Sequence, residues 1–254
     1  MRSTKNDAEV SGTSTRNPLR YPRRGGGDLL QTAATLLGRE ESADRQEPWT
    51  EARFELETRQ QLERLTEWAE PLGLFIDLKD YGRLHRGRRE HDTIGEGDED
   101  WIFKITRGSG FGLVPSSRNV VSGMVSDWFA VFPATPAQYF ERLLLSNLIY
   151  PGLNSLEGFC HIDDRFVIVT SQPFIAGRNA TPVEIRRFLA PQGFVKLCDA
   201  TWYRDSDGLA LFDVGGSNLF CDENGTLIPI DIIPIQPTGP LADTVKRAFA
   251  RISS

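Results

Sequence analysis

The first regular pattern of apolar positions lies in residues 50–70, where apolar residues recur every three or four positions. This spacing predicts an amphipathic helix, and Pro71 and Gly73 provide the signals that end it. Three short segments follow, separated by charged or glycine-rich turns, and we expect each to form a strand. These segments span residues 74–82, 91–97 and 100–106. Residues 107–134 are rich in glycine and serine and are interpreted as an insertion with a hairpin of its own.

A second helix is predicted to begin at Thr135, because Thr135, Pro136 and Gln138 have the spacing of a capping box with proline at the first helical position. Glu141 shares a helical face with Leu144, Leu145 and Leu148, so its carboxylate is expected to point inward. A carboxylate on an apolar face is costly unless a cation pairs with it.

The remainder of the chain alternates hairpin and helix signals. Hairpins are predicted at residues 163–164, 205–208 and 224–225, where the last turn is the strong pair Asn-Gly. Between the first two, a capping box at residues 181–184 opens a helix that stops before Pro191. This order, rich in strands first and then mixed, predicts an α+β protein with two lobes.

Composition excludes several classes of protein. The chain has 254 residues, of which 39% are hydrophobic and 25% charged, as in an ordinary globular protein. No apolar run approaches the roughly 20 residues of a membrane span, and no apolar leader follows the first methionine. The three cysteines form no C-x-x-C pair and the three histidines lie far apart, which argues against a disulfide framework and a zinc site. We expect a cytoplasmic protein.

The charge is unevenly distributed. Residues 1–27 carry six Lys/Arg and two acids, a net charge of +4, so the rest of the chain carries −10 of the total of −6. We expect residues 1–48 to form a disordered basic tail, with order beginning near Trp49. The tail could bind nucleic acid weakly, but the acidic body of 49–254 argues against nucleic acid as the main ligand.

Candidate chemistry lies near the C-terminus. Asn218 follows Asp213 by five positions, and Asp231 follows Asn218 by thirteen, across the Asn-Gly turn. Carboxylate and amide oxygens are ligands suited to Mg²⁺, which in phosphoryl-transfer sites keeps one or two protein ligands besides the phosphates. A hairpin that carries such ligands at both ends would hold them rigidly.

The same residues carry a resemblance. "DVGGSN" followed by "IDI" resembles the protein-kinase arrangement of a catalytic aspartate, a metal-binding asparagine and a metal-binding aspartate one hairpin later. Upstream, "WIFKIT", "YFERLLLSN" and "FVIVTSQPF" resemble the lysine strand, the glutamate helix and the strand that leads to the adenine-binding hinge. Over residues 60–236 the chain is most similar to the polyvalent protein kinase family of phages and mobile elements.

This resemblance implies a protein-kinase-like two-lobed fold, with a β-rich N-lobe at about 72–170 that contains one inserted helix. It also implies a hinge at 170–174 and a truncated C-lobe at 175–254. The implied cofactors are ATP and Mg²⁺, and the implied reaction is transfer of the γ-phosphoryl group to a hydroxyl of a protein or small molecule.

By the same resemblance, Lys104 contacts the α- and β-phosphates and Glu141 holds Lys104 in place. Asp213 accepts the proton of the acceptor hydroxyl, or orients it, and Asn218 and Asp231 bind Mg²⁺. The remaining implied nucleotide contacts are Gly87 and Arg88 in a phosphate loop, and Thr170, Gln172 and Phe174 along the adenine edge.

Ordinary structural roles stay open for these residues. Asp213 is also suited to capping a turn, Asn218 to starting a strand, and Lys104 to the outer face of one; Glu141 could pair with Arg142 or Arg118 instead.

The chain also departs from typical kinases, with "LF" where they have His-Arg and "DII" in place of Asp-Phe-Gly. Only 23 residues follow Asp231, too few for a full activation segment. Two rival functions therefore remain: a pseudokinase that binds nucleotide as an interaction module, and a kinase-fold enzyme that transfers AMP.

Overall fold

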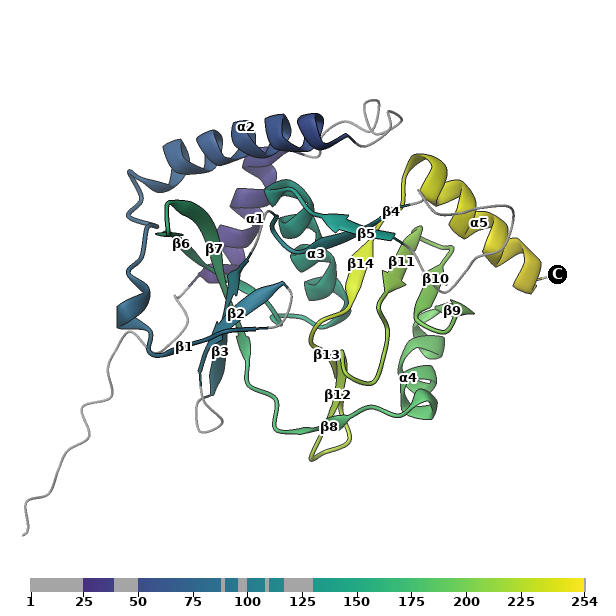
Figure 1. Cartoon of the computed structure of the whole chain (residues 1–254). Helices are drawn as coiled ribbons and strands as arrows, with labels where there is room; N and C mark the ends of the chain where they lie inside the picture. Colours follow the sequence, from purple (N-terminus) through teal and green to yellow (C-terminus); the bar gives the residue numbers. More distant parts are fainter. Residues whose placement is uncertain are drawn as a thin grey trace, which may run out of the picture.

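The computed structural model describes residues 25–38, 50–87, 90–95, 100–107, 110–116 and 130–253. Most of the expected basic tail and the expected phosphate-loop residue Arg88 lie outside these ranges. The described part is an α+β structure in which one half is built on a five-stranded sheet and the other on two smaller sheets (Figure 1).

The five-stranded sheet is antiparallel throughout, in the order β1-β2-β3-β7-β6. Its strands are β1 (Leu84–His85), β2 (His91–Ile94), β3 (Trp101–Thr106), β6 (Ser155–Ile162) and β7 (Arg165–Pro173). Asp163 and Asp164 join β6 to β7 with φ values of 49° and 60°, the left-handed geometry that a two-residue hairpin turn needs. The hairpin expected at this pair is confirmed.

Three helices cover one face of this sheet: α1 (Gly26–Leu37), α2 (Glu51–Ala69) and α3 (Pro136–Ile149). They bury a common core with the strands, and each fully buried leucine, isoleucine or phenylalanine in it contributes roughly 1.5–3 kcal/mol. Its members include Leu30 and Ala33 of α1, Leu65 of α2, Phe140 of α3, and Leu156 and Ile168 of the sheet. A second cluster, with Tyr81, Phe103 and Val169, lies under the segment that contains the 3₁₀ turn η3 (Leu78–Asp80).

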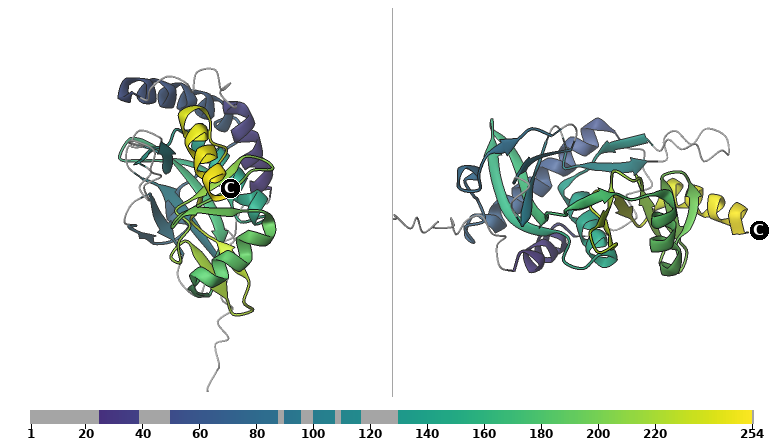
Figure 2. Two further views of the ribbon diagram at one scale, coloured as in Figure 1. Left: turned by 90° about the vertical axis from the view of Figure 1, so that its right-hand side faces the viewer. Right: turned by 90° about the horizontal axis from the view of Figure 1, so that it is seen from below.

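The other half contains a four-stranded sheet in the order β14-β11-β10-β9 and a three-stranded sheet in the order β13-β12-β8. Helix α5 (Gly239–Ser253) covers the four-stranded sheet at the end of the molecule far from β6 and β7 (Figure 2). Helix α4 (Pro182–Leu189), followed by the 3₁₀ turn η5 (Ala190–Gln192), packs into the core of this half. The strands are β8 (Gly177–Asn179), β9 (Val195–Cys198), β10 (Thr201–Arg204), β11 (Leu209–Phe212), β12 (Leu219–Asp222), β13 (Leu227–Pro229) and β14 (Ile233–Ile235).

Helix α3 connects the two halves. Phe140 and Leu143 belong to the core beneath α1 and α2, whereas Leu145 belongs to the core of the second half. The helix also packs against β14 (Figure 1). Side chains on α3 can therefore reach groups from both halves, which makes this helix decisive for the site.

Several local predictions are confirmed. Thr135 and Thr181 both form reciprocal capping boxes, and helix α2 begins at its N-cap Thr50. The Asn224-Gly225 turn joins β12 to β13, and the hairpin expected within 107–134 is formed by β4 (Leu113–Ser116) and β5 (Ala130–Pro133).

Two predictions are wrong. The expected tail, residues 1–48, contains helix α1, whose Leu30, Ala33 and Leu37 are buried in the main core. The expected strand at 74–82 is instead an irregular segment, with an isolated parallel bridge from Phe75 to Phe159 and the turn η3. No helix among the described residues is long and apolar enough to cross a membrane.

Candidate functional site

Lys104 lies in the middle of β3, where Thr93 and Thr170 are its neighbours on the adjoining strands. Its Nζ donates a hydrogen bond to the carbonyl oxygen of Ile230 at 3.0 Å and lies 3.6 Å from Oδ1 of Asp231. One side chain of the five-stranded sheet thus reaches the loop between β13 and β14 in the other half of the molecule.

Hydrogen bonds link Asp231 to the other two residues of the expected set. The backbone N–H of Asp231 donates a hydrogen bond to the carbonyl oxygen of Asn218 at 3.3 Å, and the backbone N–H of Ile230 donates to the same oxygen at 2.9 Å. The side-chain Nδ2 of Asn218 donates to the carbonyl of Asp213 at 2.8 Å. A carbonyl oxygen can only accept, so the atom of the Asn218 amide that faces Asp213 must be the nitrogen. The oxygen Oδ1 therefore points away from the Asp213 carbonyl. Lys104, Asp213, Asn218 and Asp231 therefore lie in one connected region.

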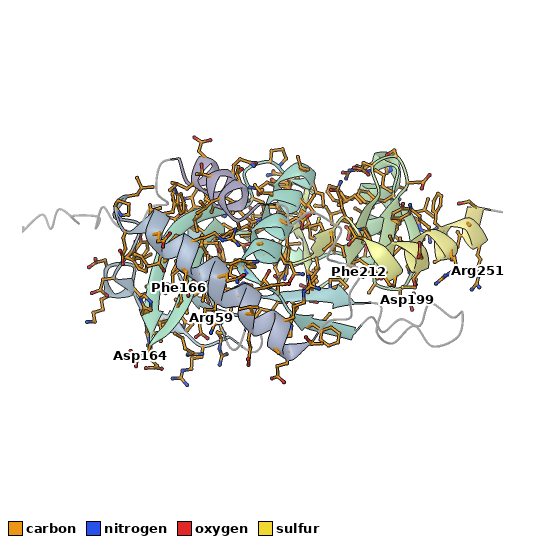
Figure 3. All side chains as sticks on the ribbon, turned by 90° about the horizontal axis from the view of Figure 1, so that it is seen from above. Arg59, Asp164, Phe166, Asp199, Phe212 and Arg251 are labelled. Carbon is orange, nitrogen blue, oxygen red and sulfur yellow. The ribbon has the colours of Figure 1, made fainter. Side chains whose placement is uncertain are left out.

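Asp213 follows the buried strand β11 and has an exposed side chain and a φ of 54°. A left-handed non-glycine residue is uncommon, although aspartate is among the residues that tolerate it. Figure 3 shows the preceding residue, Phe212, beside α5, and Phe212 packs in the core beneath that helix. Gly216 lies so close to the Ala180 carbonyl that a Cβ would approach its oxygen to 2.6 Å. The loop that holds Asp213 and Asn218 is thus anchored at both ends.

Arg142 of α3 was missed by the sequence analysis. Its guanidinium is only 6% exposed, and it donates through Nη1 to Oε2 of Glu90 at 2.6 Å and through Nη2 to Oδ1 of Asp231 at 3.2 Å. Burial alone would lower the pKa of Arg142, but the carboxylates of Glu90 and Asp231 outweigh it and raise the pKa above its ordinary value. Arg142 stays charged and links both halves of the molecule.

Within the part of the chain that the structure describes, Glu141 does not form the expected ion pair with Lys104. The ion-pair partner of Lys104 is Asp231, and the α3 side chain that reaches the site is Arg142, one position after Glu141. The apolar face used to orient Glu141 was misjudged, since Leu148 is 74% exposed. The one feature of the sequence that could have indicated this site residue is the position of Arg142 directly after Glu141 on the same helix.

Two cations also set the state of Asp231. Its side chain is 41% exposed, and burial of the rest of the group opposes ionisation. The positive charges of Lys104 and Arg142 outweigh that effect and hold the pKa of Asp231 below its ordinary value. The carboxylate is ionised at neutral pH and presents an exposed edge.

A neutral hydrogen-bonded chain lies next to these charges. His91 Nε2 is 3.0 Å from the hydroxyl of Tyr139, which in turn lies 3.4 Å from Oγ1 of Thr170. Burial and the nearby positive charge of Lys104 lower the pKa of His91 from 6.5 to about 3. At neutral pH the imidazole is therefore uncharged and adds no further cation to the region.

The expected adenine edge differs in detail. Thr170 and Gln172 are buried in β7, and their side chains share the sheet face of Lys104 because Thr170 lies directly opposite it. The N–H of Phe174 donates to the carbonyl of Asp100 at 2.9 Å, which extends the pairing of β7 with β3. Since hydrogen-bonded pairs recur every second residue, the N–H of Gln172 also faces β3. Both N–H groups are therefore engaged within the sheet, and the expected contact of Thr170, Gln172 and Phe174 with the adenine edge stays a prediction.

The same alternation turns the carbonyl of Pro173, the last residue of β7, away from β3. On that side the ladder with β6 ends at the pair Ser155 and Ser171. The amide oxygen of Gln172 is buried as well, and it has no hydrogen-bond partner in the part of the chain that the structure describes. A buried acceptor of this kind is costly unless a donor reaches it.

Gly87 is also committed to the protein itself. Its N–H donates to Oδ1 of Asp92 at 2.9 Å, and its carbonyl accepts a hydrogen bond from the Arg107 guanidinium. A Cβ at this position would collide with the carbonyl of His91. Gly87 is therefore required by a tight turn, and its N–H is not free for phosphate as the sequence analysis expected.

The donor set at Asp231 and Asn218 is compatible with Mg²⁺. Both residues offer oxygen atoms; Oδ1 of Asn218 accepts a long hydrogen bond of 3.4 Å from the hydroxyl of Ser217 and keeps a second lone pair for a metal. Within the described ranges no group of three or more His, Cys, Asp and Glu side chains is arranged to hold a metal ion. A metal here would thus need further ligands, as the phosphates of a nucleotide provide.

Comparison with known proteins points to a kinase family. A family model described as "Serine/Threonine/Tyrosine Kinase found in polyvalent proteins" matches residues 58–235, which leaves α1 and α5 outside the match. No curated protein and no solved structure matches the chain.

Proposed function

Because the chain belongs to the family of serine/threonine/tyrosine kinases found in polyvalent proteins, we propose that it is an ATP-dependent kinase that acts on a hydroxyl group. Membership makes it a kinase-like phosphotransferase. The nucleotide, the metal and the two-lobed arrangement, with the five-stranded sheet as one lobe, are our proposal.

The observation that carries the proposal is the convergence of Lys104, Asp213, Asn218 and Asp231. They come from three separate segments, since Asp213 and Asn218 share the loop between β11 and β12, yet the hydrogen bonds and the ion pair described above join them into one connected group. Phosphoryl transfer requires mainly positioning and charge compensation, and this group offers a cation, two oxygen ligands and an exposed carboxylate.

In the proposed reaction the bond between the γ-phosphorus and its bridging oxygen breaks, and a bond forms between that phosphorus and the acceptor oxygen. ADP leaves with the bridging oxygen, and the hydroxyl proton passes to the exposed carboxylate of Asp213. Lys104 would bind the phosphates, while Asn218 and Asp231 would hold Mg²⁺. The metal, when bound, would neutralise charge on the phosphate oxygens.

We assign the base to the segment that follows β7. The carbonyl of Pro173, at the end of β7, points to the side that β3 does not use and is an acceptor suited to the amino group of adenine. The unpartnered amide oxygen of Gln172 supports a ligand with an amino group, because such a group would satisfy it.

The proposal is tested by incubating the purified protein with Mg²⁺ and ATP labelled at the γ-phosphate, and by following label on the protein itself and on added proteins and small hydroxyl compounds. We expect transfer that falls at least 100-fold in Asp213→Asn and Asp231→Asn. Asp164→Asn, in the distant β6–β7 turn (Figure 3), is the matched control and should retain it. Undiminished transfer in the first two variants would refute the assignment.

A second candidate is a nucleotide-binding module without turnover. It is favoured by one observation, the engagement of Asp231 by both Lys104 and Arg142, which a metal must disturb. Nucleotide-dependent thermal stabilisation with no product would support this candidate. Intact-mass measurement of the acceptor also separates phosphoryl transfer from AMP transfer, since the two added groups differ in mass.

A further inference from the structure

Arg142 and Glu90 form a buried ion pair at the junction of the two halves. Both side chains are mostly covered, with 6% and 14% exposed, and the contact of 2.6 Å is short and charge-assisted. Burying two charges is favourable only if each keeps its partner. Glu90 therefore holds the guanidinium in place through Nη1, independently of what Nη2 contacts.

The second arm of the guanidinium reaches a different environment. Nη2 donates to Oδ1 of Asp231, the same oxygen that lies 3.6 Å from Nζ of Lys104. The Asp231 side chain is 41% exposed, so this arm is at the accessible edge of the cluster, whereas the arm at Glu90 is enclosed. Arg142 thus has one fixed contact and one that solvent can approach.

The net charge of the cluster shows what would follow if Asp231 bound a metal ion. The four groups Lys104, Arg142, Glu90 and Asp231 sum to zero, since they comprise two cations and two anions. If Asp231 binds a divalent metal, the metal compensates its negative charge, and Nη2 of Arg142 loses its acceptor. Nζ of Lys104 keeps the Ile230 carbonyl but loses its anionic partner. Two adjacent donors with uncompensated positive charge then require anionic oxygens.

We propose that Arg142 is a second phosphate-binding cation, which Glu90 positions and which rests on Asp231 until a metal-bound nucleotide enters. This inference rests on the proposed function, because the nucleotide supplies both the metal and the anion. The sequence resemblance implied a helix glutamate that holds a strand lysine; here the helix carries the cation and the glutamate precedes β2. The planar guanidinium suits phosphate oxygens, to which it can present two parallel donors.

The experiment measures binding, not turnover, by titration calorimetry of the full chain with Mg-ATP and separately with adenosine. The central variant is the double substitution Glu90→Gln with Arg142→Met, which removes both charges and leaves no unpaired buried ion. We expect Mg-ATP to bind about 10- to 100-fold more weakly, the effect of losing one charge-assisted hydrogen bond. Adenosine, which has no phosphate, should bind with unchanged affinity.

Two further variants keep the test decisive. Arg142→Lys retains the charge but cannot contact Glu90 and a phosphate together, so it should weaken Mg-ATP binding and leave adenosine binding intact even if the double variant does not fold. Arg53→Met with Glu57→Gln removes a comparable arginine–glutamate pair on α2, with a contact of 2.5 Å, and should change neither affinity.

The outcomes separate the two proposals. If Arg142→Lys and the double variant bind Mg-ATP as the wild type does, or lose affinity for adenosine and Mg-ATP equally, Arg142 has only a structural role and this inference is refuted, while the proposed function stands. If the wild-type protein binds no Mg-ATP, the proposed function itself fails, and this inference fails with it.

Discussion

The lowered pKa of His91 should make the protein lose stability as the pH falls below about 6.5, before most carboxylates titrate. His91 lies beside Tyr139, near the charges of Lys104, Arg142 and Asp231, and its pKa is lowered from 6.5 to about 3 by burial first and by Lys104 second. Asp231 acts in the opposite direction but is outweighed. The unfolded chain has no such environment, so its His91 retains a pKa near 6.5.

The sign follows from which state binds the proton. Between pH 6.5 and about 3 the unfolded state binds a proton at His91 that the folded state does not, so acidification favours unfolding. The slope approaches about 1.4 kcal/mol per pH unit within this window. From pH 7 to pH 5 the loss amounts to about 2 kcal/mol.

The measurement is urea unfolding at pH 7 and pH 5, with wild-type protein and His91→Gln. Glutamine can place a polar atom near the Tyr139 hydroxyl but does not titrate, so the variant should lose about 2 kcal/mol less than the wild type over this interval. Asp231, whose pKa is lowered, contributes stability that is lost only below about pH 4 and does not interfere. Equal pH dependence in the two proteins would show that His91 is protonated in the folded state.

Two other predictions concern the helices around α3. Gly27→Ala should stabilise the protein by about 0.5–1 kcal/mol, because the added Cβ would meet nothing within 4 Å. Gly26→Ala should destabilise the protein, because the added Cβ would lie 2.9 Å from the Cβ of Ser155. Thermal melts of both variants test whether α1 packs on β6. Gln61→Leu should cost about 1–3 kcal/mol in urea unfolding, because it removes the fully buried amide oxygen that accepts the N–H of Ala137 at 2.9 Å; an unchanged free energy of unfolding would contradict this.

Cap and turn chemistry made much of the fold predictable. The boxes at Thr135 and Thr181 and the Asn224-Gly225 hairpin depend on contacts within a few residues, so the local sequence contains all the information they need. Helix α1 had a readable pattern too, with Leu30, Ala33 and Leu37 at helical spacing, but the surrounding glycine- and arginine-rich residues suggested a disordered tail.

The sequence predicted that Asp213, Asn218 and Asp231 lie close together, but it did not predict the ion-pair partner of Lys104. Asp213, Asn218 and Asp231 are linked as their spacing suggested, because short loops connect them. Which side chain of α3 reaches the site depends instead on the rotation of this helix. Because α3 is buried on two sides, its apolar arc is too wide to fix one face. A change of one position along the helix, about 100°, brings Arg142 to the site in place of Glu141.

The arginine that joins Glu90 to Asp231 also has a consequence for synthesis. These two carboxylates are 141 positions apart in the chain (231 − 90 = 141). Contacts of such long range form late, after each half has gained its own core. A nascent or truncated chain that ends before residue 231 thus lacks the carboxylate that Nη2 of Arg142 contacts, and it should hold Arg142 through Glu90 alone.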